Sequence, residues 1–247
     1  MRKRYHEAKM GSHCYTRRRM SGRRRIYLLR HGDAAYMGTQ DGEATDDPAL
    51  SDQGVTEARA LGRLLADVPI DLAITTGLRR TQQTAELALG DRDLPIEVHR
   101  GFSEAKSGLF ETIETQEEME ALVIGAFRGA AEPGAAFLTG ETFAGVQARA
   151  TEALRALMRR SDWRCALLAC HGVVNRTLLA YALDAGPEIY RRIEQDSGCV
   201  NVLDIEGHGD DANVAYVRMI NFTPYNETKQ GMFETSLETL WRKFVGD

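Results

Sequence analysis

Two short apolar runs in this chain end in the dipeptide His-Gly. The first covers residues 26–29 and leads through Arg30 to His31, and the second covers residues 165–170 and leads to His171. A continuous apolar run of this length bounded by glycine is typical of a central parallel strand that is buried on both faces. In open α/β sheets ligands bind beyond the carboxyl ends of such strands, so we expect His31 and His171 to face one crevice.

The rest of the chain alternates between strand-like and helix-like patterns of apolar residues. Strand patterns cover residues 26–29, 71–75, 96–99, 165–170, 199–205 and 214–220. Helical periodicity covers residues 51–68, 78–89, 116–127, 141–160 and 173–183. This alternation predicts an α/β fold of three layers, α/β/α, in which helices cover both faces of a mostly parallel central sheet. Only residues 206–213 separate the last two strand patterns, which predicts a hairpin at the sheet edge.

These elements are expected to form a single domain over residues 25–247. The length suffices for one sizeable core, and nothing resembles a linker between two cores. The irregular part is the stretch 101–140, which carries acidic residues between Glu111 and Glu120 and a Gly-rich turn at 129–134. We expect this insertion to lie over the crevice as a lid.

The N-terminal segment has a different composition from the rest. The first 25 residues hold ten Lys and Arg and only Glu7 as an acid, whereas the whole chain has a net charge of −5. Such a composition predicts a basic, disordered arm over residues 1–24. An upstream start codon or vector-derived sequence is an alternative origin, and transit-peptide composition is another. Nucleic acid is not the expected partner, and this arm is the one part of the chain that we would expect to bind it.

No apolar stretch approaches the ~20 residues that a membrane span requires. We therefore expect a soluble, cytoplasmic protein without a membrane partner. Cys165, Cys170 and Cys199 fall on predicted buried strands, where a thiol behaves as a small hydrophobe, and this favours a reducing compartment. Neither the cysteines nor the two histidines show metal-ligand spacing, so no metal is expected.

Arg30-His31-Gly32 at the end of the first strand resembles the hallmark of branch 1 of the histidine phosphatase superfamily, the phosphoglycerate-mutase-like proteins. Four more segments resemble that family in the same order, and the similarity runs from about residue 26 to about residue 223. They are Leu50-Ser51-Asp52-Gln53-Gly54, Thr76-Gly77-Leu78-Arg79-Arg80-Thr81-Gln82-Gln83-Thr84-Ala85, Phe102-Ser103-Glu104 and Gly140-Glu141-Thr142. The resemblance implies a phosphoglycerate-mutase-like fold, with Ser51 as the N-cap of the first long helix.

The resemblance also implies a catalytic set. His31 would be the nucleophile that forms a phosphohistidine, Arg30 and Arg80 would grip the phosphoryl oxygens, and His171 would add a hydrogen-bond donor. Glu104 would give a proton to the leaving oxygen and then activate water. The substrate-binding residues would be Arg30, Gly32, Arg80, His171 and Gly172. No cofactor is implied.

Four residues near these motifs receive other expectations. Arg79 falls at a variable position of the family pattern and is expected to be a solvated helix residue. Glu141 is expected to cap or buttress rather than react. Ala34 and Met37 stand where the family often has a hydroxyl and an amide that help to hold phosphate, so backbone N–H groups or another side chain must replace them.

The favoured function is a metal-independent phosphomonoester hydrolase acting on a small phosphorylated metabolite. One alternative is a mutase that returns the phosphoryl group to another hydroxyl of the substrate, but residues 39–44 lack the Asn-Arg-Phe-x-Gly-Trp cluster of the cofactor-dependent mutases. A second alternative is a non-catalytic module that binds a phosphate ligand or nucleic acid. The apolar residues of the tail are expected to pack on the domain, with a homodimer contact as the alternative; they are Met232, Phe233, Leu237, Leu240, Trp241 and Phe244.

Overall fold

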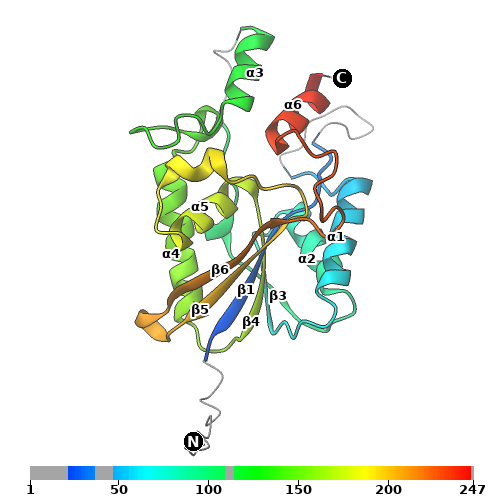
Figure 1. Ribbon diagram of the computed structural model, residues 1–247, viewed down its shortest axis with the longest axis vertical. Coiled ribbons are helices and arrows are strands. Elements are labelled where there is room, and N and C mark those ends of the chain that lie inside the picture. Colours follow the sequence, from blue (N-terminus) through cyan, green and yellow to red (C-terminus); the bar gives the residue numbers. More distant parts are fainter. Residues whose placement is uncertain (1–21, 37–46, 109–113, 246–247) are drawn as a thin grey trace, which may run out of the picture.

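The computed structural model describes residues 22–36, 47–108 and 114–245. Its six strands form one sheet in the order β3-β2-β4-β1-β5-β6, with helices on both sides (Figure 1). The strands are β1 (Arg24–Arg30), β2 (Leu72–Thr75), β3 (Ile96–Val98), β4 (Cys165–Cys170), β5 (Val200–Glu206) and β6 (Asn213–Phe222). The helices are α1 (Asp52–Leu64), α2 (Arg79–Leu89), α3 (Gln116–Ile124), α4 (Phe143–Arg159), α5 (Gly172–Ala182) and α6 (Ser236–Val245).

The sheet is mixed, and its larger part is parallel. β3, β2, β4 and β1 run parallel, whereas β5 is antiparallel to β1 and forms an antiparallel pair with the edge strand β6. The predicted α/β class, the mostly parallel sheet and the edge hairpin are therefore confirmed. The hairpin follows from chain length, because the short link between β5 and β6 allows only a direct reversal.

The two central strands place alternate side chains on opposite faces of the sheet. In β1, Ile26 and Leu28 belong to the core that α4 and α5 cover, whereas Leu29 belongs to the core under α1 and α2. In β4, Leu168 and Leu167 divide between the two cores in the same way. Burial on both faces explains why residues 26–29 of β1 and all of β4 are apolar at consecutive positions rather than at every second one.

The register between β1 and β4 places the two histidines side by side. Arg30 pairs with Cys170 in the parallel ladder, so His31 and His171 are the first residues beyond the ends of neighbouring strands. Backbone bonding continues one step further, because the His31 N–H donates to the Cys170 carbonyl over 3.0 Å. Both imidazoles therefore emerge at the same edge of the sheet, as expected.

The loop after β1 lies directly on the first turn of α1. Ser51 caps this helix, since its Oγ accepts from the Gly54 N–H, and the same hydroxyl donates to Asp33 over 2.6 Å. A Cβ on Gly54 would stand 1.9 Å from the Asp33 carbonyl oxygen, and one on Gly32 would stand 2.5 Å from the Gly54 carbonyl oxygen. Two glycines are thus needed for this close approach of backbone to backbone.

The ends of the chain differ from expectation at two places. Arg24, assigned to the basic arm, lies in β1, where its buried guanidinium donates to the Met158 carbonyl over 2.5 Å and stacks on Trp163. Residues 1–21 of the predicted arm lie outside the described residues.

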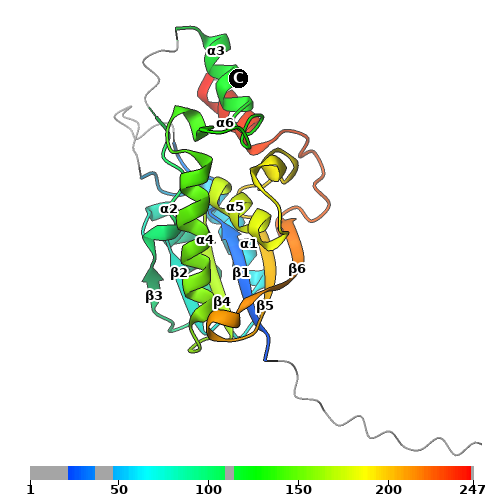
Figure 2. The same cartoon turned by 90° about the vertical axis from the view of Figure 1, so that its left-hand side faces the viewer.

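Phe233 precedes α6 and is 94% exposed, whereas Trp241 on that helix is buried. Figures 1 and 2 show α6 beside α3, at the end of the molecule where the site lies.

Within the described residues, every helix is too short or too polar to cross a lipid bilayer. Cys165, Cys170 and Cys199 are buried free thiols, as their place in the apolar strands predicted.

The contact between the β1 loop and α1 predicts the effect of one substitution. Gly54→Ala should lower the free energy of unfolding by about 3 kcal/mol, because backbone must move to admit the methyl group. Urea unfolding followed by the fluorescence of buried Trp163 measures this change.

Gly129→Ala is the matched control for this experiment. The nearest atom to its Cβ would be 3.7 Å away, so its unfolding free energy should stay within about 0.5 kcal/mol of the wild-type value. Equal stabilities of the two variants would contradict the packing described for Gly54.

Candidate active site

His31 follows β1 and is only 2% exposed. Its Nδ1 lies 2.7 Å from the carbonyl oxygen of Gly32, and because a carbonyl only accepts, Nδ1 carries the proton and Nε2 keeps its lone pair. Burial lowers the pKa of His31 well below its ordinary value of 6.5, and the charges of Arg30 and Arg80 lower it further. At neutral pH His31 is therefore a neutral imidazole with Nε2 available as a nucleophile.

His171 follows β4 as the N-cap of α5 and is fully buried. Its Nε2 lies 3.0 Å from the Thr76 hydroxyl, which lies 3.1 Å from the Thr81 hydroxyl. Thr81 in turn donates to the Leu78 carbonyl over 2.8 Å. Each hydroxyl has one proton to give, so this chain of donors starts at the Nε2–H of His171.

The other ring nitrogen of His171 is left for a ligand. Its Nδ1 is buried and has no hydrogen-bond partner within the part of the chain that the structure describes. Burial lowers the pKa of His171 well below 6.5, and His31, Arg80 and Arg30 lower it further. The rings of His171 and His31 meet edge to face, with centroids 5.3 Å apart.

Arg30 is the last residue of β1 and lies between His31 and the start of α5. Its Nη1 donates to the backbone carbonyl of Gln195, whereas its buried Nε has no partner among the described residues. A Cβ on Gly172 would stand 3.6 Å from this Nε, so the guanidinium lies within van der Waals range of the first turn of the helix. Arg30 is thus fixed at one end and keeps a donor free at the other.

Arg80 contributes a second guanidinium from the first turn of α2. It is 5% exposed, and its buried Nε and Nη1 have no hydrogen-bond partner in the described ranges. Nη1 lies 3.8 Å from Asp47 Oδ1, which is within ion-pair range but beyond a hydrogen bond. The Tyr36 ring faces this guanidinium at 5.8 Å. Buried N–H donors of a permanent cation are expected to hold an anion when one binds.

Glu104 lies at the N-terminal end of α5, next to His171. Its Oε2 accepts from the Val173 N–H over 3.3 Å, and its Oε1 accepts from the N–H of Ala105 over 3.0 Å. The loop that carries Glu104 follows the edge strand β3. Sequence spacing alone therefore does not predict that Glu104 lies next to His171. The structure thus gathers five of the predicted site residues, namely Arg30, His31, Arg80, Glu104 and His171.

A half-buried ion pair clamps the loop of Glu104. Arg149 on α4 donates to three backbone carbonyls of this loop, those of Gly101 (3.0 Å), Ser103 (2.6 Å) and Glu104 (3.2 Å). The same guanidinium forms two bonds with the Glu141 carboxylate, of 2.7 and 2.8 Å. Glu141 thus lies where a buttress was expected, and Arg149 fixes the backbone from which the Glu104 side chain extends.

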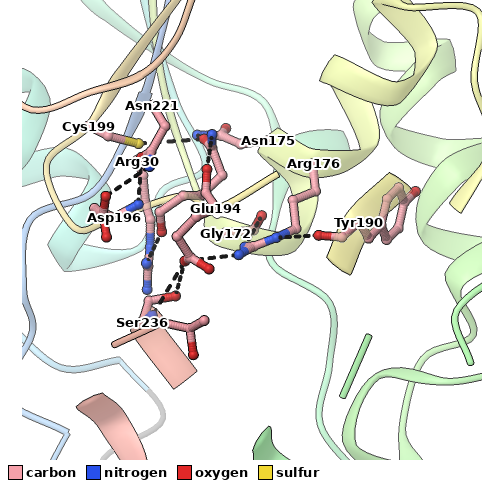
Figure 3. Close-up of polar contacts among 12 residues, drawn as sticks. Arg30, Gly172, Asn175, Arg176, Tyr190, Glu194, Asp196, Cys199, Asn221 and Ser236 are labelled. Carbon is pink, nitrogen blue, oxygen red and sulfur yellow. Dashed lines mark hydrogen bonds and ion pairs between the residues drawn. The ribbon is translucent and has the colours of Figure 1, made fainter. Parts of the chain in front are cut away.

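A second network fixes the surroundings of Arg30 (Figure 3). The Arg176 guanidinium donates to the Gly172 carbonyl over 3.2 Å and pairs with Glu194 at 3.0 Å. Glu194 also accepts from the Ser236 hydroxyl over 2.8 Å at the start of α6. This chain of contacts connects the first turn of α5 with the C-terminal helix.

A cavity of about 580 Å³ opens beside His31 and Arg30. Described residues of the predicted lid, 101–140, do not line it, although they carry Glu104. Its walls come instead from the loop after β1, the start of α1, the 196–197 turn, Tyr225 and the C-terminal segment 231–243. The role of 101–140 as a lid stays a prediction.

The two site glycines differ in what surrounds them. The Gly32 N–H already donates to the Thr84 hydroxyl over 3.1 Å and its missing side chain allows the close approach to Gly54, whereas Gly172 lies within van der Waals range of Arg30. Substrate contact by either backbone stays a prediction.

Sequence reasoning missed several residues of this site. Thr76 and Thr81 belong to the matched arginine motif, but only the fold shows that they orient His171. Tyr36 lines the cavity beside the expected gap at Ala34, and burial raises the pKa of its phenol, which stays a neutral O–H group. Met37 lies outside the described residues. No cluster of three metal-ligating side chains occurs among residues 22–36, 47–108 and 114–245.

The proton positions predict how the site responds to an anion. Without phosphate, His31 and His171 should stay neutral well below pH 6.5, and saturating inorganic phosphate should raise both pKa values, because its charge offsets Arg30 and Arg80. Imidazole ¹⁵N shifts measured against pH, with and without phosphate, report this change.

Two arginine variants test the source of the effect. Arg80→Met should weaken phosphate binding by about tenfold or more, whereas exposed Arg79→Met should change it by less than about twofold. Ordinary histidine pKa values that do not respond to phosphate would contradict the proposed geometry.

Comparison with known proteins agrees with these motifs. The family model described as "Histidine phosphatase superfamily (branch 1)" matches residues 26–216. The adenosylcobalamin/alpha-ribazole phosphatase of Escherichia coli K12 is 28% identical over 184 residues, which cover 73% of this chain and 90% of that protein. Human 6-phosphofructo-2-kinase/fructose-2,6-bisphosphatase 4 is 32% identical over 168 residues, or 67% of this chain, and the chain spans only 34% of that relative.

Solved structures show the same fold. The alpha-ribazole phosphatase from Shigella flexneri superposes with a TM-score of 0.61 at 26% identity, covering 80% of this chain and 96% of that one. YhfR of Bacillus stearothermophilus superposes with a TM-score of 0.63 at 28% identity, covering 78% and 96%. Because the family model matches most of the chain and the motifs converge on one site, this protein belongs to branch 1 of the histidine phosphatase superfamily.

Proposed function

We propose that this enzyme is a metal-independent phosphomonoester hydrolase that works through a phosphohistidine on His31. The observation that supports this most directly is a neutral, buried imidazole with a free Nε2, set among guanidinium N–H groups that have no hydrogen-bond partner among the described residues. A nucleophile, fixed cations and a nearby carboxyl are what two successive phosphoryl displacements require.

In the first displacement, Nε2 of His31 attacks phosphorus and forms an N–P bond as the ester P–O bond breaks. The leaving oxygen takes a proton from Glu104. In the second, the Glu104 carboxylate takes a proton from water, whose oxygen attacks phosphorus and breaks the N–P bond. Inorganic phosphate leaves, and His31 and Glu104 return to their first states.

The cations stabilise the charge that shifts onto the phosphoryl oxygens. The unpaired donors of Arg30 and Arg80 supply fixed positive charge in a buried site, where it acts more strongly than in water. His171 gains a proton at Nδ1 when the anion binds and then donates from there. Tyr36 lies beside Arg80 and is the side chain we propose in place of the contacts missing at Ala34.

The substrate is proposed to be a small phosphorylated metabolite. A cavity of about 580 Å³ suits a small molecule rather than a protein segment. The relatives named as alpha-ribazole and fructose-2,6-bisphosphate phosphatases support hydrolysis of such esters. The three buried free thiols support a cytoplasmic location.

The test of this function is phosphate release from p-nitrophenyl phosphate and a panel of phosphorylated metabolites, with chelator present. Turnover should resist the chelator, and rapid quenching in base should trap an acid-labile phosphoenzyme. His31→Ala should abolish both signals, since it removes the attacking nitrogen.

Release that needs added metal, or a phosphoenzyme that persists in His31→Ala, would overturn the proposed mechanism. Transfer of the phosphoryl group within the substrate, without release, would identify a mutase.

The clamp on the loop of Glu104 predicts a dependence on the leaving group. Glu104→Gln should slow alkyl phosphates by about 10²-fold or more but p-nitrophenyl phosphate much less, because nitrophenolate leaves without a proton. Arg149→Met should show a weaker form of the same selective loss, mainly in kcat, because the loop that holds the acid is loosened.

Arg159→Met is the matched control, since Arg159 lies on the same helix in an exposed pair with Glu152. Its rates should match the wild-type values for both substrates. Equal losses for alkyl and nitrophenyl esters in Arg149→Met would refute the positioning role.

A further inference from the structure

We infer that the cavity beside the phosphate site selects monoesters whose leaving group is uncharged and has a planar or apolar face. This inference rests on the proposed function and names its substrate class. The inference is drawn from the C-terminal segment 231–243. This segment lies outside the phosphate motifs and forms part of the wall of the cavity that His31 also lines.

The acidic groups of this cavity outnumber its basic groups. Among the described residues that line it, Asp33, Glu57, Asp196 and Glu234 are carboxylic acids. Beyond the catalytic Arg30, the lining cations in the same described part are Arg242 and Lys243. A second negative charge on the substrate would therefore meet an acidic wall.

Each of those two cations is already paired within the wall. Lys243 Nζ lies 2.7 Å from Asp33 Oδ1, and Arg242 Nη2 lies 2.7 Å from Glu234 Oε2. Lys229, just outside the lining, pairs with Asp196 at 2.6 Å. An anionic leaving group would have to displace one of these carboxylates before it gained a cation.

The sequence excludes a cation from the two internal stretches that the structure does not describe. Residues 37–46 and 109–113 contain neither Lys nor Arg. Whatever their position, these stretches cannot reverse the charge balance of the wall.

Aromatic and apolar groups complete the cavity. Phe233 lines it and is 94% exposed, so it offers a large apolar surface to a bound molecule. Tyr36, Tyr225, Met232 and Leu240 line the same space. A planar or apolar leaving group would cover Phe233, and its hydroxyl groups could bond the carboxylates nearby.

A matched pair of substrates tests the charge rule. Glycerol 3-phosphate and 3-phosphoglycerate share a carbon skeleton, but the second carries a carboxylate on its leaving group. We expect kcat/KM to be about tenfold or more higher for glycerol 3-phosphate, because Lys243 and Arg242 are already paired with Asp33 and Glu234 and, beyond the catalytic arginine, leave no described lining cation for the extra carboxylate.

Variants of the wall show whether these residues cause the preference. Glu234→Gln releases Arg242 and should move the ratio of kcat/KM about three- to fivefold toward 3-phosphoglycerate. Glu152→Gln, which releases Arg159 on α4 in the same way, should leave the ratio unchanged. Phe233→Ala should raise KM for 1-naphthyl phosphate about three- to tenfold relative to glycerol 3-phosphate.

The outcomes separate this inference from the proposed function. Hydrolysis of p-nitrophenyl phosphate through His31 together with a preference for 3-phosphoglycerate would overturn the inference alone. A ratio that Glu234→Gln and Glu152→Gln move equally would do the same. No hydrolysis of any ester by the wild-type enzyme would overturn the proposed function and this inference with it.

Discussion

The burial of permanent positive charge beside two imidazoles is the constraint on which the rest of the site depends. Arg30 and Arg80 have buried N–H groups that donate to no described protein group. Burying a donor without a hydrogen-bond partner costs free energy. The fold holds Arg30 through the Gln195 carbonyl and covers Arg80 with Tyr36. Burial lowers the pKa of both histidines and the same charges lower it further, so the arrangement that we propose for anion binding also keeps the proposed nucleophile neutral.

Rigid elements hold most of the groups that we propose contact the phosphoryl group. Parallel pairing of β1 with β4 fixes His31 beside His171, and the first turn of α2 fixes Arg80. Glu104 lies on a loop, and Arg149 compensates by tying three of its carbonyls to α4. An acid that must give and then take a proton needs this fixed position as much as the nucleophile does.

The wall of the cavity has a separate origin. Segment 231–243 reaches the site through Lys243 on Asp33 and Ser236 on Glu194, contacts that do not involve the reacting groups. Changes in this segment can therefore alter which ester enters without disturbing phosphoryl transfer. A separate origin of the cavity wall and the phosphate site suits this family, because the relatives compared above are named for chemically different phosphate esters.

The sequence alone determined the fold class, the strand pair that ends in His31 and His171, and the motif that supplies Arg80. These follow from local signals, since apolar periodicity and short motifs record strands, caps and turns directly. The clamp by Arg149, the hydroxyl chain from His171 and the position of Glu104 were decided by tertiary structure. So was the part of the cavity wall that the C-terminal segment 231–243 forms. Contacts between segments far apart in the chain depend on packing, and no local pattern records which side chains packing brings together.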